Sequence, residues 1–257
     1  MLFLLSPAKS LDYSPPPVEV KATRAQFLEQ SNTLIDVLRG KSVADIRSLM
    51  DLSQPLAELN VERYRLWRSR FTARNSLPAL LAFDGDVYDG LAARRLAPDD
   101  LLWAQDHVAI LSGLYGVLRP FDRMQPYRLE MGTALATKSG RNLYEYWGDT
   151  LAEHLNRRAA AQATPVIVNL ASQEYFRAVD RPALLPRVVE CVFEDWSDGA
   201  WKVIGFFAKR ARGLMARHAI TQRIGHPDGL LAFAADGYRH AAAASRPDRF
   251  VFRRRRE

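Results

Sequence analysis

The fold is decided by the stretch Met1-Leu2-Phe3-Leu4-Leu5-Ser6-Pro7-Ala8-Lys9-Ser10. Its apolar run ends abruptly at Ser6-Pro7, a pattern typical of a strand that is buried on both faces of a sheet. Such a strand needs helices on both sides, so the stretch predicts an α/β protein. Lys9 follows the strand directly, and open α/β sheets bind ligands beyond the carboxyl ends of their strands. Lys9 is therefore the first candidate site residue.

The same unit, an apolar run followed by a polar loop, recurs along the chain at 77–83, 108–111 and 166–170. Between these runs, apolar residues recur at helical spacing. The predicted helices cover 27–38, a short segment opened by a capping box of Ser42 and Asp45, about 61–71, a segment from about 101 capped by Asp99, and 143–155. This alternation predicts a largely parallel sheet flanked by helices, or a barrel-like variant of it.

The C-terminal part has a different pattern. Residues 187–193 and 201–207 flank Ser197-Asp198-Gly199, which predicts an antiparallel hairpin with a glycine turn. A last strand is predicted at Phe250–Phe252. The sheet is therefore mixed, and we expect one compact domain over residues 1–252 followed by a solvated basic tail, residues 253–257.

The composition favours a polyanionic partner. The chain has 257 residues, of which 36 are basic and 29 acidic, and its formal charge is +7. A positive surface attracts nucleic acid, most strongly at low salt. Four of the charges belong to the run Arg253–Arg256, and removing them from +7 leaves +3 for the body. The charge of the residues outside this run therefore supports a polyanionic partner less strongly than the total charge does.

Secretion and membrane insertion are disfavoured. The apolar run at residues 2–5 is far too short for the core of a signal peptide, and no segment approaches the roughly 20 apolar residues that span a bilayer. The single cysteine, Cys191, lies in an alternating apolar segment and is interpreted as a small core residue. We therefore expect a cytoplasmic monomer without disulfides or membrane contacts.

The acidic and histidine residues do not predict a metal site. A calcium loop opening at Asp84 would need an oxygen ligand at position 88 and a glutamate at position 95, where Tyr88 and Arg95 stand. The histidines are scattered without the spacing of zinc ligands. We expect no metal and no cofactor.

Loops at the predicted strand ends are rich in polar side chains. They hold Lys9; Asp84, Asp86 and Tyr88; Ser112 to Glu130; and Asn169, Ser172, Glu174 and Tyr175. Taken singly, Asp84, Ser112 and Ser172 are interpreted as turn formers and helix caps. Taken together, the loops predict a shared polar site.

The segment 111–119 has two interpretations. Gly113 and Gly116 precede Arg119, and backbone N–H groups exposed by glycines can bind phosphate, as in a helix-hairpin-helix that this segment loosely matches. A tight turn packed against the core explains the glycines equally well. The sequence leaves both open.

Basic residues cluster on the helix predicted after the hairpin. They include Lys209, Arg212 and Arg217, and Arg210 shares a stripe with Arg217 and Ile224. A stripe that mixes arginine with isoleucine can face the protein, where a buried guanidinium requires an anionic partner. Glu130, Glu174 or a ligand phosphate could be that partner, and the sequence does not choose.

Several motifs resemble the YaaA-like family of bacterial peroxide-stress proteins. They are Ser6-Pro7-Ala8-Lys9, Phe83-Asp84-Gly85-Asp86-Val87-Tyr88, Gln125-Pro126-Tyr127-Arg128-Leu129-Glu130-Met131-Gly132, Val168-Asn169-Leu170-Ala171-Ser172 and Ala211-Arg212-Gly213-Leu214-Met215. The resemblance extends over nearly the whole chain. It departs at Ala232, where the family usually has glycine, and at Ser10, where threonine is frequent.

The resemblance implies a function in survival of hydrogen peroxide, in which unincorporated iron is kept low and Fenton damage to DNA is limited. It also implies a compact, family-specific α/β fold with a positively charged cleft and a helix-hairpin-helix-like element that binds DNA. The expected partner is duplex, distorted or partly unpaired DNA.

The leading hypothesis is a DNA-binding protein of peroxide defence. Its candidate anion-binding residues are Lys9, Gly113, Gly116, Arg119, Arg128, Asn169, Ser172, Lys209, Arg212 and Arg217, with Tyr88, Tyr115, Tyr127 and Tyr175 as stacking faces for unpaired bases. The hypothesis depends on these side chains meeting in one electropositive pocket.

Two alternatives remain. One is an enzyme acting on a small anionic molecule, with Lys9 as nucleophile or base and Glu130 or Glu174 as acid or base, because a desolvated lysine can lose its proton and arginine cannot. The other is direct iron binding, which would need Asp84, Asp86, Glu130 and Glu174 to converge.

Overall fold

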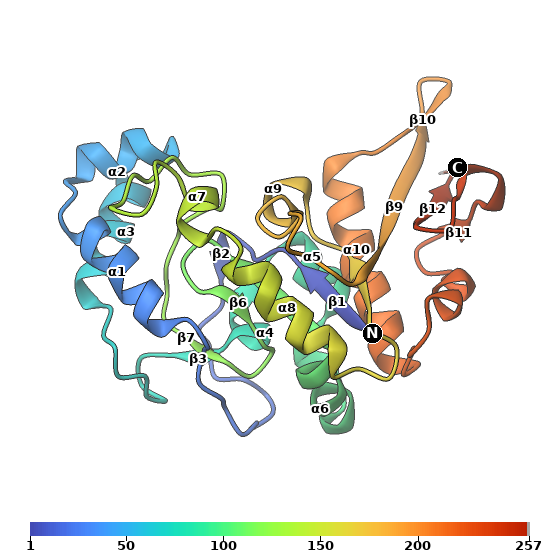
Figure 1. Ribbon diagram of the computed structural model, residues 1–257, viewed down its shortest axis with the longest axis horizontal. Helices are drawn as coiled ribbons and strands as arrows, with labels where there is room; N and C mark the ends of the chain where they lie inside the picture. The colour runs from blue at the N-terminus through green and yellow to red at the C-terminus, as the bar shows by residue number, and fades with distance from the viewer. Residues whose placement is uncertain (256–257) are drawn as a thin grey trace.

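Strand β1 (Leu2–Leu5) lies in the middle of the main sheet, with all four of its residues buried. The computed structural model describes residues 1–255, and in this part of the chain eight strands form one mixed sheet (Figure 1). The order is β11-β12-β9-β8-β1-β5-β6, with β10 paired to β9. Strand β1 is parallel to both neighbours, which confirms the prediction from its apolar run.

The remaining strands of this sheet are β5 (Val108–Ser112), β6 (Gly116–Leu118), β8 (Val166–Asn169), β9 (Arg187–Ser197), β10 (Ala200–Lys202), β11 (Arg239–His240) and β12 (Arg249–Arg254). Two small antiparallel sheets pair β2 (Ser10–Leu11) with β4 (Phe83–Asp84), and β3 (Leu77–Pro78) with β7 (Arg123–Met124). The fold is thus the mixed, largely parallel α/β arrangement that the alternation predicts.

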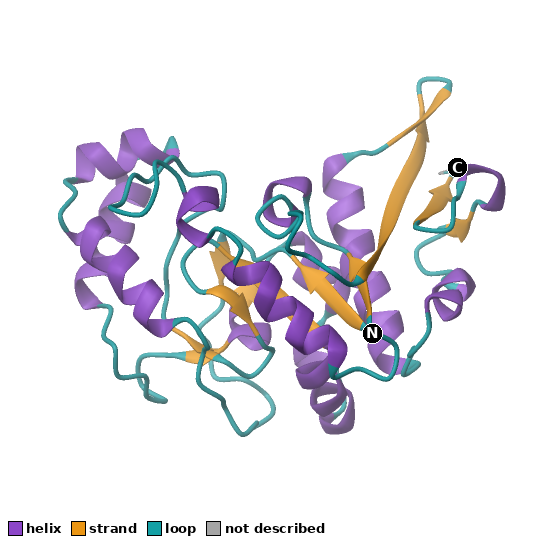
Figure 2. Cartoon of the chain, in the orientation of Figure 1, coloured by secondary structure: helices purple, strands orange, loops and turns teal. Residues whose placement is uncertain are grey.

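Helices flank the central strands (Figure 2). They are α1 (Leu28–Arg39), α2 (Val43–Met50), α3 (Gln54–Leu66), α4 (Ala79–Ala82), α5 (Asp86–Leu91), α6 (Pro98–His107), α7 (Leu143–Trp147), α8 (Thr150–Ala160), α9 (Gln173–Phe176) and α10 (Gly205–Thr221), with 3₁₀ turns at Ala93–Arg95, Pro227–Ala232 and Ala242–Ala244. Helices α1 to α3 gather at the end of the molecule opposite β12 (Figure 1). No helix of the described residues is long and apolar enough to cross a membrane.

Helices α5 and α10 pack backbone against backbone. A Cβ atom on Gly90 would collide with the carbonyl oxygen of Arg210, and one on Gly213 would collide with that of Val87. Only glycine permits this approach, which sets the N-terminal half of α10 beside the loop that opens α5. The contact therefore positions side chains of both helices near the loop that follows β1.

Several element predictions were wrong in detail. The run 77–83 forms two short strands around the single helical turn α4, because its strands pair with β7 and β2 rather than with the main sheet. The helix predicted over 143–155 is divided at Gly148, which has a φ of 49°. Helix α6 begins at Pro98 after Ala97, so Asp99 lies inside its first turn and is not its cap.

Other boundaries also moved. Helix α3 begins at Gln54 and ends before Trp67, and β10 is short because the chain enters α10 at Gly205. The capping box of Ser42 and Asp45 is present as predicted.

The boundary of the predicted tail was wrong. Strand β12 continues through Arg254, whose side chain is 5% exposed and forms ion pairs with Asp195 at 2.7 Å and Asp236 at 2.6 Å. Arg253 pairs with Glu194 at 2.8 Å. Ion pairs with carboxylates beside β12 therefore hold both arginines in the last strand of the sheet. The last two residues of the predicted tail lie outside the described residues.

Candidate functional site

One open pocket of about 410 Å³ lies beyond the carboxyl ends of β1 and β8. We call it the main cleft. It is lined by Ser6, Pro7, Ala8, Lys9, Ser10, Asp84, Gly85, Asp86, Val87, Glu130, Ser172, Glu174, Tyr175, Lys209 and Arg212. The structure thus brings together polar side chains from all four loops singled out in the sequence, and adds two residues of α10.

Glu130 joins two basic residues on one wall of the cleft. Its Oε1 lies 3.3 Å from Nζ of Lys9 and accepts a hydrogen bond from Nε of Arg128 at 3.1 Å. Its Oε2 is buried and has no hydrogen-bond partner among the described residues. Arg128 does not line the cleft itself and acts from behind Glu130. Glu130, rather than a ligand, is the anionic partner of this arginine.

The loops after β1 and β8 are tied together by serines. Ser172 donates its backbone N–H to Oγ of Ser6 at 2.8 Å, and Asn169 accepts the N–H of Ala171 at 2.9 Å. These are turn-forming bonds, so Asn169 and Ser172 shape the backbone of the site. Glu174 accepts the N–H of Gly132 at 2.9 Å, which holds its carboxylate at the cleft mouth.

Helix α10 supplies the cations of the opposite wall. Lys209 lies 3.8 Å from Oδ2 of Asp86, a weak ion pair that spans the packed helices. Arg212 is half-buried, and this burial lowers the pKa of its guanidinium, an effect that the charge of Glu190 opposes. Within residues 1–255 no carboxylate forms an ion pair with Arg212 and its guanidinium makes no hydrogen bond. Among the described residues, Arg212 is therefore a partly desolvated cation without an ion-pair partner, and Glu190 acts on it only through its charge.

Besides Arg128, two more of the predicted anion-binding arginines do not reach the cleft. Strand β6 runs antiparallel to β5, with Leu118 opposite Ile110, so Arg119 lies at the edge of the sheet where β5 begins. Arg217 donates to the carbonyl oxygens of Leu91 and Ala92 at 3.0 and 3.2 Å, and so caps the end of α5. The prediction placed both in one site because sequence distance does not show the direction of a strand or the turn of a helix.

The predicted stacking tyrosines are buried. Tyr88 donates to the carbonyl oxygen of Ser6 at 3.0 Å, and the hydroxyls of Tyr127 and Ser112 lie 2.6 Å apart. Tyr115 is fully buried and accepts a hydrogen bond from Nε1 of Trp67. Burial raises the pKa of Tyr88, Tyr115 and Tyr127. Tyr175 lines the cleft but is only 8% exposed, so the prediction of stacking faces was wrong.

The glycines of segment 111–119 form a tight turn packed against the core. A Cβ atom on Gly113 would collide with the carbonyl of Leu129, and Gly116, at a φ of +67°, faces the Trp147 ring. Strands flank this turn and its residues are buried, so it cannot cradle phosphate or form part of a helix-hairpin-helix. Helices α2 and α3 do follow each other with a short connector, but they lie outside segment 111–119.

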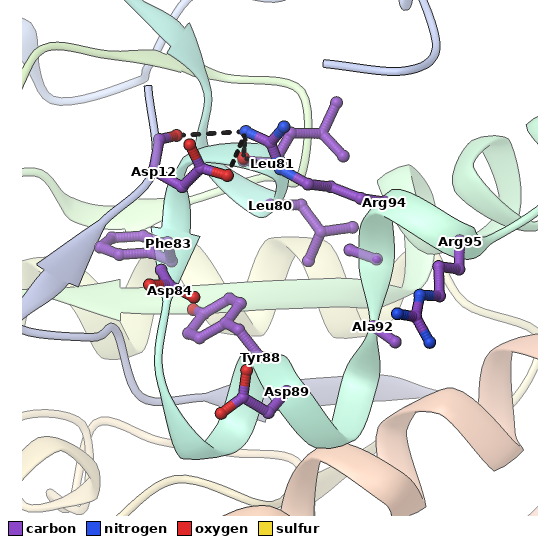
Figure 3. A pocket seen from close by; sticks show the side chains of 11 residues that line it. Asp12, Leu80, Leu81, Phe83, Asp84, Tyr88, Asp89, Ala92, Arg94 and Arg95 are labelled. Carbon is purple, nitrogen blue, oxygen red and sulfur yellow. Dashed lines mark hydrogen bonds and ion pairs between the residues drawn. The ribbon is translucent and has the colours of Figure 1, made fainter. Parts of the chain in front are cut away.

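A smaller pocket of about 240 Å³ lies on the other side of β4 and shares Asp84 with the main cleft (Figure 3). Its most prominent side chain, Arg94, points at Asp12 and Leu81. It pairs with the Asp12 carboxylate at 3.1 Å and donates to the Leu81 carbonyl at 2.9 Å. These bonds hold the segment after β2 against α4, so Arg94 has a structural role in this pocket.

Sequence reasoning placed Asp86 among the polar strand-end loops and among candidate calcium and iron ligands, but it missed the ion pair of Asp86 with Lys209. It also missed the role of Ser6 in the cleft, because Ser6 was interpreted only as the end of a strand. The available signal was their position directly after strands. In the described part of the chain no group of three or more His, Cys, Asp or Glu residues is arranged to hold a metal ion.

The family model described as peroxide stress protein YaaA matches residues 1–244. The chain belongs to the YaaA family. It is 60% identical over 255 residues to a UPF0246 protein of Bordetella petrii, an alignment that covers 99% of this chain and 100% of the relative. UPF0246 proteins of Paracidovorax citrulli and Verminephrobacter eiseniae are each 62% identical over 256 residues, with 99% of this chain and 99% and 98% of the relatives covered. The predicted YaaA membership is thereby confirmed.

Proposed function

We propose that this peroxide-stress protein acts in the cytoplasm by binding DNA through the main cleft, and in this way limits Fenton damage. The observation that carries the proposal is Arg212, a half-buried guanidinium that lines the same pocket as Lys9 and Lys209 and has no ion-pair partner within residues 1–255. A desolvated arginine is stabilised by a charged hydrogen-bond acceptor, and a phosphate oxygen is well matched to its geometry.

The charges of the cleft favour one phosphate group over a continuous backbone. Three cations, Lys9, Lys209 and Arg212, face four carboxylates, those of Asp84, Asp86, Glu130 and Glu174. A groove that follows a duplex would be lined mainly by cations. Carboxylates can instead accept hydrogen bonds from the edge of a base. The main cleft therefore suits a nucleotide that is displaced from the stack in distorted or partly unpaired DNA.

The test is a titration of labelled duplex and bubble DNA at several salt concentrations, with Arg212→Gln beside the wild type. If Arg212 contacts a phosphate, this variant lowers the slope of log affinity against log salt by about one. The control is Arg141→Gln, because the Arg141 side chain is 91% exposed outside the main cleft. Affinity that is independent of salt, or equal slopes for wild type and Arg212→Gln, would contradict the proposal.

The effect on unincorporated iron is proposed to follow from the same cleft. Asp84, Asp86, Glu130 and Glu174 line it, yet the described residues include no group arranged to hold a metal ion. Chelatable iron and survival after peroxide are measured in cells that carry wild type or Arg212→Gln. If cells with this variant are fully protected, the effect on iron does not depend on the main cleft. If the purified protein binds iron saturably, direct sequestration of iron explains the effect instead.

A second candidate function is catalysis on a small anionic molecule. It is favoured by the contact of 3.3 Å between Lys9 and Glu130 and by the excess of carboxylates in the cleft. The Lys9 side chain is 66% exposed, however, and lacks the desolvation that nucleophilic lysines use. If Lys9→Ala keeps peroxide protection while Arg212→Gln loses it, the catalytic hypothesis is excluded.

A further inference from the structure

A second polar pocket lies at the opposite edge of the main sheet, where β5 begins. It has a volume of about 560 Å³, and we call it the amino-edge pocket. Its polar lining consists of Gln26, Gln105, Asp106, His107, Arg119, Asp122, His154, Arg158 and Gln162. The amino-edge pocket shares no residue with the main cleft and is therefore a separate site.

The fold brings three basic side chains to this pocket from two elements. Arg119 follows β6, which runs back along β5 to the amino edge. His154 and Arg158 are four residues apart on α8 and so lie on one face of the helix. Phe27 packs against the imidazole of His154, with ring centroids 5.2 Å apart, and fixes its place beside the arginines.

These basic groups have donors that the protein does not use. Nη2 of Arg158 donates to the carbonyl oxygen of Val108 at 3.2 Å, but its Nη1 is buried without a hydrogen-bond partner among the described residues. The ring nitrogens of His154 make no hydrogen bond within residues 1–255. Buried donors are normally satisfied, so the buried Nη1 of Arg158 lacks an acceptor that it would ordinarily have, whereas His154 is half-buried. The amino-edge pocket thus contains a hydrogen-bond donor that lacks an acceptor.

Two acidic residues line the pocket: the carboxylate of Asp106 acts on Arg158 only through its charge, and Asp122 is already engaged. Asp122 is 1% exposed, and its Oδ1 accepts from Nη2 of Arg119 at 3.0 Å and from Oγ1 of Thr23 at 2.6 Å. Its Oδ2 accepts the backbone N–H of Arg119 at 2.8 Å. The carboxylate of Asp122 therefore neutralises Arg119 and leaves Arg158 without an ion pair in the described part of the chain.

The pKa of His154 reflects its burial and the guanidinium groups around it. Its pKa is lowered from 6.5 to about 4, mainly by burial and in addition by the charges of Arg158, Arg157 and Arg119. An imidazole surrounded by three guanidinium groups resists a further positive charge. A bound anion would oppose this effect and raise the pKa of His154, so the pKa of His154 reports anion binding.

We propose that the amino-edge pocket binds a small oxyanion, a phosphate or carboxylate group, between Arg119, Arg158 and His154. The oxygens accept hydrogen bonds from the unused donors, and the negative charge favours the protonated imidazole. The ligand class is defined by this chemistry: a compact polyanion such as inorganic phosphate, pyrophosphate or a tricarboxylate.

The experiment follows the His154 ring signals by NMR as a function of pH, with and without inorganic phosphate, pyrophosphate or citrate. We expect saturable shifts and a rise in the His154 pKa when the anion is bound. Arg158→Gln should weaken anion binding by about tenfold or more, since a charged hydrogen bond is lost. The matched control is Arg157→Gln, which removes the same charge from the adjacent residue of α8, outside the pocket.

Two further comparisons test whether the loss of binding is specific to this pocket. Because Arg158 also caps the end of α6, its variant is compared with His154→Gln, and the fold of each is checked by circular dichroism. Arg212→Gln should bind the anions normally, which separates this pocket from the main cleft. If duplex DNA displaces the bound anion, the phosphate source is DNA rather than a free ion. The absence of saturable shifts at millimolar anion, or equal weakening by Arg157→Gln and Arg158→Gln, would overturn the proposal.

Discussion

Glu130 determines how the basic residues of the main cleft are arranged. Its Oε1 holds Lys9 and Arg128, and its Oε2 remains buried without a partner among the described residues. A ligand that offers an N–H or O–H group there would remove an unsatisfied acceptor, whereas a simple anion would not. At the scale of single residues, the cleft thus combines an anion site at Arg212 with an acceptor site at Glu130.

Arg254 is expected to contribute strongly to stability. Its side chain is 5% exposed and pairs with Asp195, which is 3% exposed. Arg254→Met leaves a buried carboxylate without its cation and should lower the free energy of unfolding by about 3–5 kcal/mol, as measured by urea denaturation. The control Arg249→Met, in an exposed pair of the same strand, should cost about 1 kcal/mol or less. Equal effects would show that the burial of Arg254 is unimportant.

His154 should make stability depend on pH. Its pKa is about 4 in the folded protein, because of burial and three nearby arginines, against an ordinary value of 6.5. The unfolded chain binds more protons between these values, so stability is present above pH 6.5 and is lost as the pH falls toward 4, by about 2–3 kcal/mol at most. His154→Gln should reduce this loss in thermal or urea unfolding between pH 7 and 4. An unchanged pH profile would contradict the assignment.

At the scale of elements, the contact of α5 with α10 controls the geometry of the cleft. Gly213→Ala places a methyl group against the Val87 carbonyl, and should separate the helices at a cost of about 1–3 kcal/mol. It should also reduce DNA affinity, because Lys209 and Arg212 lie on the displaced helix. Gly205→Ala is the control, since a Cβ at Gly205 meets nothing within 4 Å. DNA affinity that survives Gly213→Ala would show that the helix contact does not set the cleft.

The sequence predicted elements well where periodicity and burial agree. The apolar runs at Leu2–Leu5 and Val166–Asn169 became adjacent parallel strands, and their loops meet in the cleft. Prediction failed where tertiary pairing decides. The apolar run at 77–83 forms a helical turn, and Arg119 is carried away from the cleft because β6 reverses direction. Neither outcome is encoded in local residue patterns.

At the scale of the whole molecule, the sheet separates two sites of different composition. The main cleft mixes lysines with carboxylates beyond the carboxyl ends of β1 and β8, and the amino-edge pocket combines arginines with a histidine where β5 begins. This separation was not visible in the sequence, where Arg119 and Arg128 lie in one short segment. Arg119 lines the amino-edge pocket, whereas Arg128 pairs with Glu130 of the main cleft.

The last strand is expected to be essential for the fold. Strand β12 pairs with β9 over six residues and covers Phe193, whose ring stacks on Phe252 at 5.5 Å. Removal of residues 249–257 would leave an unpaired apolar edge at β9, so we expect aggregation or loss of cooperative unfolding. The measurement is solubility together with calorimetry. A soluble, cooperatively folded truncation would show that β9 can end the sheet.

The central place of β1 also sets the order in which the chain can fold during synthesis. Its two neighbours, β5 and β8, begin at Val108 and Val166, so more than a hundred residues must be translated before Leu2–Leu5 finds its first partner. At bacterial elongation rates that delay is on the order of ten seconds. During this delay an apolar strand lacks its partners, so we expect the nascent chain to need shielding from aggregation.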